Sequence, residues 1–261
     1  MTAEVTIILP FYNAGEFFSE TLASVTEQTY DRWHLILVDD GSTDESPEIA
    51  RKFKERHPDQ VSLLISGGVG AARARNIATD IADTRYIAFL DADDIWHPEK
   101  LATQLAAMKE SGAVFSYTAF RKVTPNAIKG SRIFFVPDTI TRSELLKSCP
   151  IRCFTVIYDQ IALGKLHMPD VKMRNDYLTW FDALERIETL SAPNHTSRPI
   201  LGINVDLGFY RIHPSSLTGN KFRAARYQWQ AYRENLHLPF HQAAYYFAFY
   251  AMSGIINRKR F

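Results

Sequence analysis

Two aspartates that stand two residues apart, Asp91 and Asp93, directly follow the apolar segment 86–90. Side chains two residues apart in an extended chain point the same way, so both carboxylates are expected on one side. Paired hard oxygen ligands at a strand end suit an Mg²⁺ or Mn²⁺ ion that is shared with a diphosphate. An acidic solvated turn is the alternative, and the all-apolar strand before the pair favours the metal site. We expect Asp94 or His97 to serve as a cap for the next helix.

A second acidic loop, 39–44, follows the apolar segment 34–39. Asp39 stands at the strand end, and there we favour a hydrogen bond to a nucleobase or a ribose. For residues 42–44 we favour a tight turn in which Asp and Ser side chains satisfy the backbone. Tyr12 and Asn13 follow the apolar segment 5–10. The Tyr12 ring could stack on a base or cap the core, and Asn13 is open to the same two interpretations.

Small residues open a helical segment at Gly70, and helix N-termini favour anions. Arg75 within this segment could pair with a base or a phosphate, while Arg73 could equally lie on a solvated helix face. The segment lacks the Gly-Lys-Ser/Thr ending of a phosphate-binding loop, and no G-x-G-x-x-G follows the first apolar run. The sequence therefore argues against a kinase-like or dinucleotide-binding site.

Two candidates for chemistry lie in the second half of the chain. Asp176 stands at the start of a helical segment, where it is either a favourable charge on the first turn or a general base. His213, in the stretch 210–216, could join a metal shell, although a lone histidine is more often structural.

Alternating strand and helix segments position these residues in the first half of the chain. Such alternation is typical of a largely parallel sheet, and Val, Ile and Leu dominate the strands. Open α/β sheets bind ligands at the carboxyl ends of their strands, so the three polar loops should converge on one crevice. The expected strands are 5–10, 34–39, 61–66 and 86–90, and the expected helices are 16–28, 47–56, 70–81 and 98–110.

The second half has a mixed pattern, and we divide the chain into 1–115, 116–220 and 221–261. Residues 243–256 are apolar and aromatic and precede Arg258, Lys259 and Arg260. This stretch falls short of the roughly 20 residues that span a bilayer. It could be an interfacial helix, a helix packed on the core, or both at once. The expected strands here are 114–121, 133–136, 154–158 and 207–211, with helices at 141–147 and 176–188.

Composition restricts the class of protein further. The 261 residues are 46% hydrophobic and 23% charged, as in an ordinary globular protein. A net charge of +1 without a dense basic run argues against nucleic acid as a partner. The N-terminus lacks the pattern of a signal peptide, so we expect a cytosolic protein. The spacing of Cys149 and Cys153 fits neither a zinc knuckle nor a redox pair, and both are expected to be reduced thiols.

Four motifs together resemble the family 2 glycosyltransferases, which are inverting enzymes of the GT-A fold. The motifs are 5–13, 38–44, 70–76 and 89–94, and the resemblance covers about the first 115 residues. Within this family, the sequence resembles bacterial members that build O-antigen, capsule or teichuronic-type polymers. The resemblance implies an α/β GT-A fold with a Rossmann-like, mostly parallel sheet flanked by helices. A mixed acceptor-binding part and C-terminal helices would follow.

The resemblance also implies roles for individual residues. Asp176 matches the second position of a Glu-Asp pair that supplies the catalytic base, while Asn175 departs from the first. Asp93 would ligate Mn²⁺ or Mg²⁺, and His213 would complete the metal shell. The positions that would hold the donor, usually a uridine diphosphate sugar, are Pro10, Tyr12, Asn13, Asp39, Arg75, Asp91, Ala92 and Asp93.

The function implied is transfer of a sugar from a UDP-sugar to a hydroxyl of a saccharide, often lipid-linked, at the inner face of the membrane. One alternative is a binding module that keeps the nucleotide-binding fold but has lost catalysis. The presence of Asp91, Asp93 and Asp176 together argues against this alternative. Another is a nucleotidyltransferase, which should carry a glycine- and lysine-rich phosphate loop after the first strand. Residues 13–16 read Asn-Ala-Gly-Glu and do not form such a loop.

Overall fold

Parallel strands form the N-terminal half of the central sheet. A computed structural model describes residues 2–124, 132–190, 199–212 and 221–256. The parallel strands lie in the order β3-β2-β1-β4. The side chains of β1, β2 and β4 are almost all buried, whereas the edge strand β3 is only partly buried. Their bounds are β1 (Val5–Phe11), β2 (Trp33–Asp39), β3 (Val61–Ile65) and β4 (Tyr86–Phe89).

The sheet continues into a mixed half. The order beyond β4 is β8-β6-β9-β5, with β7 paired to β6. The pairs β4–β8, β8–β6, β6–β7 and β9–β5 are antiparallel, whereas β6 and β9 are parallel. The bounds are β5 (Ile95–Trp96), β6 (Phe115–Val123), β7 (Ile133–Phe134), β8 (Ile157–Asp159) and β9 (Ile200–Arg211).

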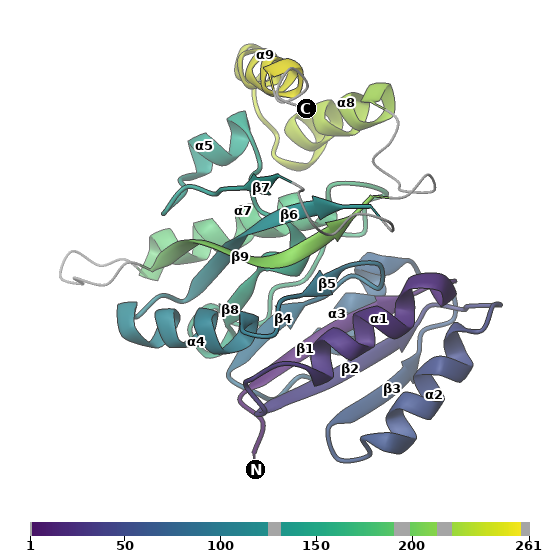
Figure 1. Cartoon of the computed structure of the whole chain (residues 1–261). Helices are drawn as coiled ribbons and strands as arrows, with labels where there is room; N and C mark the ends of the chain where they lie inside the picture. The colour runs from purple at the N-terminus through teal and green to yellow at the C-terminus, as the bar shows by residue number, and fades with distance from the viewer. Residues whose placement is uncertain (1, 125–131, 191–198, 213–220, 257–261) are drawn as a thin grey trace.

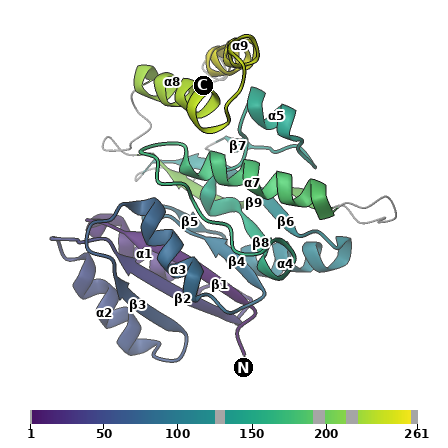
Figure 2. The ribbon, with the colours of Figure 1, turned by 180° about the vertical axis from the view of Figure 1, so that it is seen from behind.

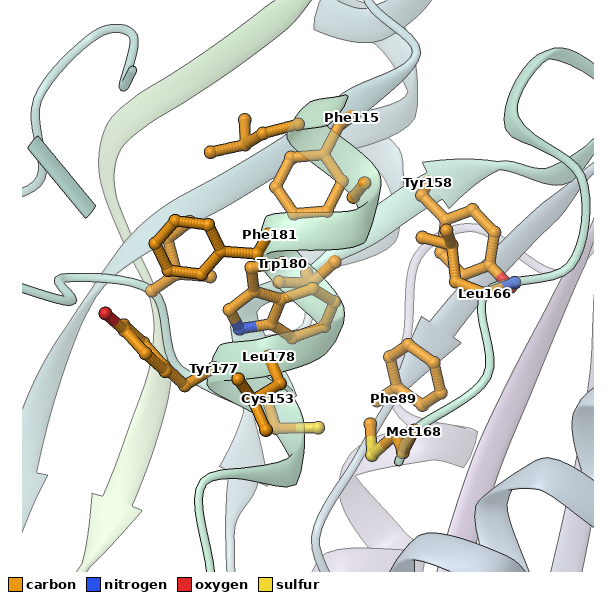
Figure 3. Packing of buried hydrophobic residues seen from close by; sticks show 14 of the residues in the cluster. Phe89, Phe115, Cys153, Tyr158, Leu166, Met168, Tyr177, Leu178, Trp180 and Phe181 are labelled. Atoms are coloured by element: carbon orange, nitrogen blue, oxygen red, sulfur yellow. The ribbon is translucent and has the colours of Figure 1, made fainter. Parts of the chain in front are cut away.

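Helices cover both faces of this sheet, as Figures 1 and 2 show from opposite sides. One face carries α1 (Gly15–Thr26), α2 (Ser46–Arg56) and α4 (Lys100–Ser111); the other carries α3 (Ala71–Ile81) and α7 (Asn175–Leu190). On the second face the indole of Trp180 in α7 packs 6.1 Å from the ring of Phe89 and 5.5 Å from that of Phe115, between centroids (Figure 3). This packing fixes where α7 lies over β4 and β6.

The C-terminal helices lie beside α5 (Arg142–Lys147), at the end of the molecule away from the N-terminus (Figure 1). They are α8 (Lys221–Gln230), the π-helical turn η3 (Ala231–Asn235) and α9 (Phe240–Ile256). The hydroxyl of Tyr232 in η3 donates to the carbonyl of Leu146 at 2.5 Å, and the buried Ala243 joins the core on the α7 face. Of the helices in the described ranges, none is long and apolar enough to cross a membrane.

The elements predicted for the first half are confirmed to within about two residues. Two predictions for the second half are wrong in detail. The expected strand 154–158 divides into the 3-10 turn η1 (Cys153–Thr155) and the short β8, followed by α6 (Gln160–Leu163). The expected strand 207–211 is only the end of β9, which begins at Ile200 and pairs with β6 through register shifts.

Candidate active site

The segment after β4 is a tight turn rather than an extended chain. The amide of Asp94 donates to the carbonyl oxygen of Asp91 at 3.1 Å, and the carbonyl of Ala92 accepts from Thr21 Oγ1 of α1 at 2.9 Å. Asp91 and Asp93 therefore do not lie in an extended chain, and the prediction that strand alternation places both carboxylates on one side is wrong. The turn brings the two carboxylates close enough for the charge of Asp93 to raise the pKa of Asp91.

Asp94 is fully buried and has a role different from the expected helix cap. Its Oδ1 accepts from the backbone amide of Arg211 at 3.0 Å, which ties the turn to the end of β9. The backbone amide of Glu99, which directly precedes α4, donates a hydrogen bond to His97 Nδ1 at 3.3 Å. Neither candidate is the N-cap of α4, which is Glu99 without a side-chain capping hydrogen bond, so the predicted cap is wrong.

Arg75 reaches the turn from the buried side of α3. Its side chain is nearly buried, and its Nη2 forms an ion pair with Asp91 Oδ1. Burial raises the pKa of Asp91 and the neighbouring Asp93 adds to this, while the Arg75 guanidinium opposes both. Burial, with Asp93 and Asp91, also raises the pKa of Asp94 well above its usual range. Three carboxylates thus crowd one turn, where added positive charge would be stabilising.

The loops after β1 and β2 are joined to each other by side chains. Asp39, which pairs with Phe11 in the sheet, accepts a hydrogen bond from the amide of Ser42 at 2.8 Å. Asn13, at φ 48°, accepts from the amide of Thr43 at 2.8 Å. Side chains satisfy the backbone amides of this loop as predicted, with Asp39 and Asn13 as the acceptors, although no backbone hydrogen bond closes a tight turn at 42–44 among the described contacts.

Tyr12 and Pro10 flank the first loop in different environments. Pro10 is buried in β1 opposite Val38. The Tyr12 side chain is 62% exposed, so the alternative that it caps the core is wrong. Its ring is therefore accessible to a ligand, and the predicted stacking on a base stays a prediction.

Asp40 joins the end of β2 to the loop before α3, a role that was not predicted from the sequence. Its Oδ1 accepts from Ser66 Oγ and the amide of Val69, both at 2.7 Å, and its Oδ2 accepts from the amide of Gly70 at 2.8 Å. Gly70, at φ 91°, directly precedes α3. The only local signal was a second aspartate at the end of β2, because Asp40's partners lie about 30 residues away.

Asp176 approaches the same turn from α7. It lies in the first turn of that helix, half-buried, and its charge raises the pKa of Asp91 and of Arg75. Asn175, the departure from the family pattern, places its side-chain oxygen 2.7 Å from the amide of Asp176. The Asp91–Asp94 turn, Arg75 and Asp176 thus come close enough for their charges to act on one another, and the roles predicted for these residues stay predictions.

The 3-10 turn η1 lies close to the aspartate turn and to the start of α7, where a strand was predicted from the sequence. Burial raises the pKa of the Cys153 thiol well above its usual range, and Arg75, Asp91 and Asp176 also act on it. Both cysteines are free, as predicted. The carbonyl of Phe154 accepts from the Trp96 indole at 2.8 Å, which holds η1 against β5.

The residues present fit a divalent cation that a ligand would help to coordinate. Within the described ranges no three or more His, Cys, Asp or Glu side chains are grouped to hold a metal, and His213 lies outside those ranges. Mg²⁺ commonly takes one or two carboxylates together with substrate phosphates. The turn offers such oxygens, and Asp94 Oδ2 is buried without a hydrogen-bond partner among the described residues.

The chain belongs to glycosyl transferase family 2, whose model matches residues 6–158. It is similar to WfgD of Escherichia coli, named a UDP-Glc:α-D-GlcNAc-diphosphoundecaprenol β-1,3-glucosyltransferase, at 34% identity over 96% of this chain and 93% of that protein. It is also similar to TuaG of Bacillus subtilis (strain 168), a glycosyltransferase assigned to teichuronic acid biosynthesis, at 33% identity over 97% of each chain.

Solved structures confirm the GT-A fold. Residues 1–349 of S. aureus TarS bound to UDP-GlcNAc superpose with a TM-score of 0.66 at 18% identity, over 96% of this chain and 72% of that one. The mannosyltransferase PcManGT of Pyrobaculum calidifontis, in complex with GDP-Man and Mn²⁺, gives a TM-score of 0.64 at 18% identity, over 92% of this chain and 66% of that one. At these identities the likeness concerns the fold alone.

Proposed function

We propose that the chain transfers a sugar, with inversion, from a UDP-sugar to a hydroxyl of a lipid-linked saccharide in the synthesis of a bacterial surface polysaccharide. One observation carries the proposal: the Asp91–Asp94 turn, Arg75 and Asp176 lie together although they come from three separate parts of the chain. The printed activity of WfgD supports both the donor class and the lipid-linked acceptor.

The donor would lie across the carboxyl ends of β1, β2 and β4. The exposed ring of Tyr12 would stack on the uracil, beside Pro10 and Asn13. One carboxylate oxygen of Asp39 accepts a hydrogen bond from the amide of Ser42, and its other oxygen would accept a hydrogen bond from the nucleoside. Asp91 and Ala92 would contact the ribose or sugar, with Arg75 holding Asp91 in place.

Asp93 would hold a Mn²⁺ or Mg²⁺ ion together with the diphosphate, and His213 would complete its shell. Such an ion would offset the negative charge that builds on the departing diphosphate. Asp93 suits this role because it shares the turn with Asp91 and Asp94, whose pKa values are raised first by burial and then by the charges of the neighbouring carboxylates.

Asp176 would act as the general base. It would accept the proton of the acceptor hydroxyl while that oxygen forms a bond to the anomeric carbon. The bond from the anomeric carbon to the diphosphate oxygen breaks on the opposite face, and the diphosphate leaves with the electron pair. The configuration at the anomeric carbon is inverted.

We expect Asp176→Asn to lower kcat by about 10² to 10⁴, because an amide cannot accept the proton. UDP affinity should stay within about twofold, since the Asp91–Asp94 turn is unchanged. Transfer rates with a panel of UDP-sugars and calorimetric UDP binding measure the two effects. An unchanged kcat in the purified variant would remove Asp176 from the mechanism.

The acceptor proposal draws on exposed apolar side chains of α8 and α9. They are Phe222, Phe240, Tyr245 and Met252, and the exposed Arg223 and Arg226 also lie in α8. One side of α9 packs on the rest of the protein, which was one of the two alternatives for residues 243–256. The exposed side chains would suit an interface with anionic lipid. An enzyme docked there would meet a lipid-linked acceptor at the bilayer surface.

Replacing Phe222 and Phe240 by Ser should weaken binding to anionic vesicles by about tenfold or more, because each buried Phe contributes about 1.5–3 kcal/mol. Flotation with vesicles of phosphatidylglycerol and phosphatidylcholine measures this. The control is Ile161→Ser, which removes a comparably exposed apolar side chain from α6. Undiminished flotation of the double variant would refute a membrane role for these side chains.

A further inference from the structure

Arg174 holds an unusual backbone conformation directly before α7. Its φ is 70°, in the left-handed region that non-glycine residues seldom adopt. Its carbonyl nevertheless accepts from the amide of Leu178 at 3.0 Å, so this conformation directs the first turn of the helix. Asp176 lies two residues further on, in that same turn. Since such a conformation costs on the order of 1 kcal/mol or more, the surroundings must hold it.

The residue that holds Arg174 comes from the C-terminal helix. Arg174 Nη2 donates to the hydroxyl of Tyr250 in α9 at 2.7 Å, and its guanidinium lies 5.4 Å from the centre of the Tyr250 ring. A hydrogen bond combined with a cation–π contact fixes both the position and the tilt of the guanidinium. The contact joins residues 76 positions apart in the chain.

α9 is in turn fixed on α5, so it can act as a rigid support. The hydroxyl of Tyr246 lies 3.4 Å from Ser143 Oγ, and Lys147 Nζ lies 5.4 Å from the centre of the Phe249 ring. Cys149 follows α5, and the charges of Asp176 and Arg174 both act on its thiol. α9 thus contacts both α5, through Ser143 and Lys147, and Arg174, two residues before Asp176.

We propose that Tyr250 is a positioning residue, which through Arg174 fixes the Asp176 carboxylate against the Asp91–Asp94 turn. This inference rests on the proposed role of Asp176 as general base. It assigns the C-terminal helix a part in the chemical step, in addition to its exposed apolar side chains. Displacing a catalytic base by about 1 Å can lower the rate of the catalysed reaction by up to about 10²-fold.

The first experiment compares two variants of α9 and one of α8 in the full chain. Tyr250→Phe removes the hydroxyl and keeps the ring, Tyr250→Leu removes both, and Tyr227→Phe removes a hydroxyl from the neighbouring helix α8. We expect kcat to fall about 3- to 10-fold in Tyr250→Phe and further in Tyr250→Leu, with UDP affinity and donor KM unchanged. Tyr227→Phe should behave as wild type.

The second experiment separates the backbone from the side chain at position 174. Glycine adopts φ 70° without a clamp, whereas alanine does not. Arg174→Gly should therefore keep more of kcat than Arg174→Ala, and adding Tyr250→Phe to Arg174→Gly should cause no further loss. Equal losses in the glycine and alanine variants would contradict the proposal, because the side chain would then act directly.

Two other results would overturn the inference. A kcat unchanged in both Tyr250 variants would show that α9 does not position the base. A fall in UDP affinity parallel to kcat would show that α9 supports the whole site. Asp176→Asn, assayed in parallel, distinguishes the failures: if that variant keeps its rate, the proposed base is wrong, whatever the Tyr250 variants do.

Discussion

Asp39 and Asp40, adjacent at the end of β2, make different kinds of contact. Asp39 keeps one oxygen for the amide of Ser42 and leaves the other for a ligand, whereas Asp40 uses both oxygens on the loop 66–70. A carboxylate has no donor of its own, so it alone can accept two backbone amides and a hydroxyl without loss. Asp40 thereby sets the start of α3, the helix that delivers Arg75.

We expect Asp40→Asn to destabilise the protein by about 1–3 kcal/mol, because an amide hydrogen would face a backbone amide. UDP affinity should fall as well, since the start of α3 shifts and Arg75 moves with it. Urea unfolding and calorimetric UDP titration check both effects. The control is Asp59→Asn at an exposed position, and a variant indistinguishable from that control would contradict this role for Asp40.

At the scale of elements, α4 holds η1 in place through a buried lysine. Lys100 Nζ donates to Gln104 Oε1 at 2.5 Å and to the carbonyl of Thr155 at 3.2 Å, and it lies 5.0 Å from the centre of the Trp96 ring. Burial lowers the pKa of Lys100 to about 7. The sequence located this helix well, but its period could not show that this lysine points inward, because its partners lie on another segment.

This lysine makes stability depend on pH in a defined direction. Its pKa in the folded protein lies below the value of about 10.4 in the unfolded chain, so the unfolded state binds more protons between about pH 7 and 10. The contribution of Lys100 to stability therefore rises with pH in this window, by up to about 1.4 kcal/mol per unit, and is constant below it. The advantage of wild type over Lys100→Met should grow accordingly.

Urea unfolding of wild type and Lys100→Met at pH 7, 8 and 9 measures this difference. Subtracting the variant removes the contributions of buried Tyr and Cys groups, which titrate in both proteins. Lys54→Met, at an exposed position of α2, should follow the wild-type curve at each pH. A difference between wild type and Lys100→Met that stays constant with pH would contradict a buried, titrating Lys100.

At the scale of the whole molecule, the sequence predicted what depends on local pattern. β1 to β4 and the helices between them follow from apolar runs and short connections, and the loops after three of these strands converge as expected. The second half depends on distant pairing: β9 joins β6 from about 85 residues away and with register shifts. Arg174, Tyr250 and Lys100 act across such distances, so no local pattern could reveal them.

The central claim is that the Asp91–Asp94 turn binds a cation together with the diphosphate of a sugar donor. Calorimetric titration of UDP in Mn²⁺ and in EDTA, on wild type, Asp93→Asn and Asp59→Asn, tests it most directly. We predict that EDTA and Asp93→Asn each weaken UDP binding by about tenfold or more, whereas Asp59→Asn binds as wild type. Equal UDP affinity in all proteins and in both solutions would contradict the claim.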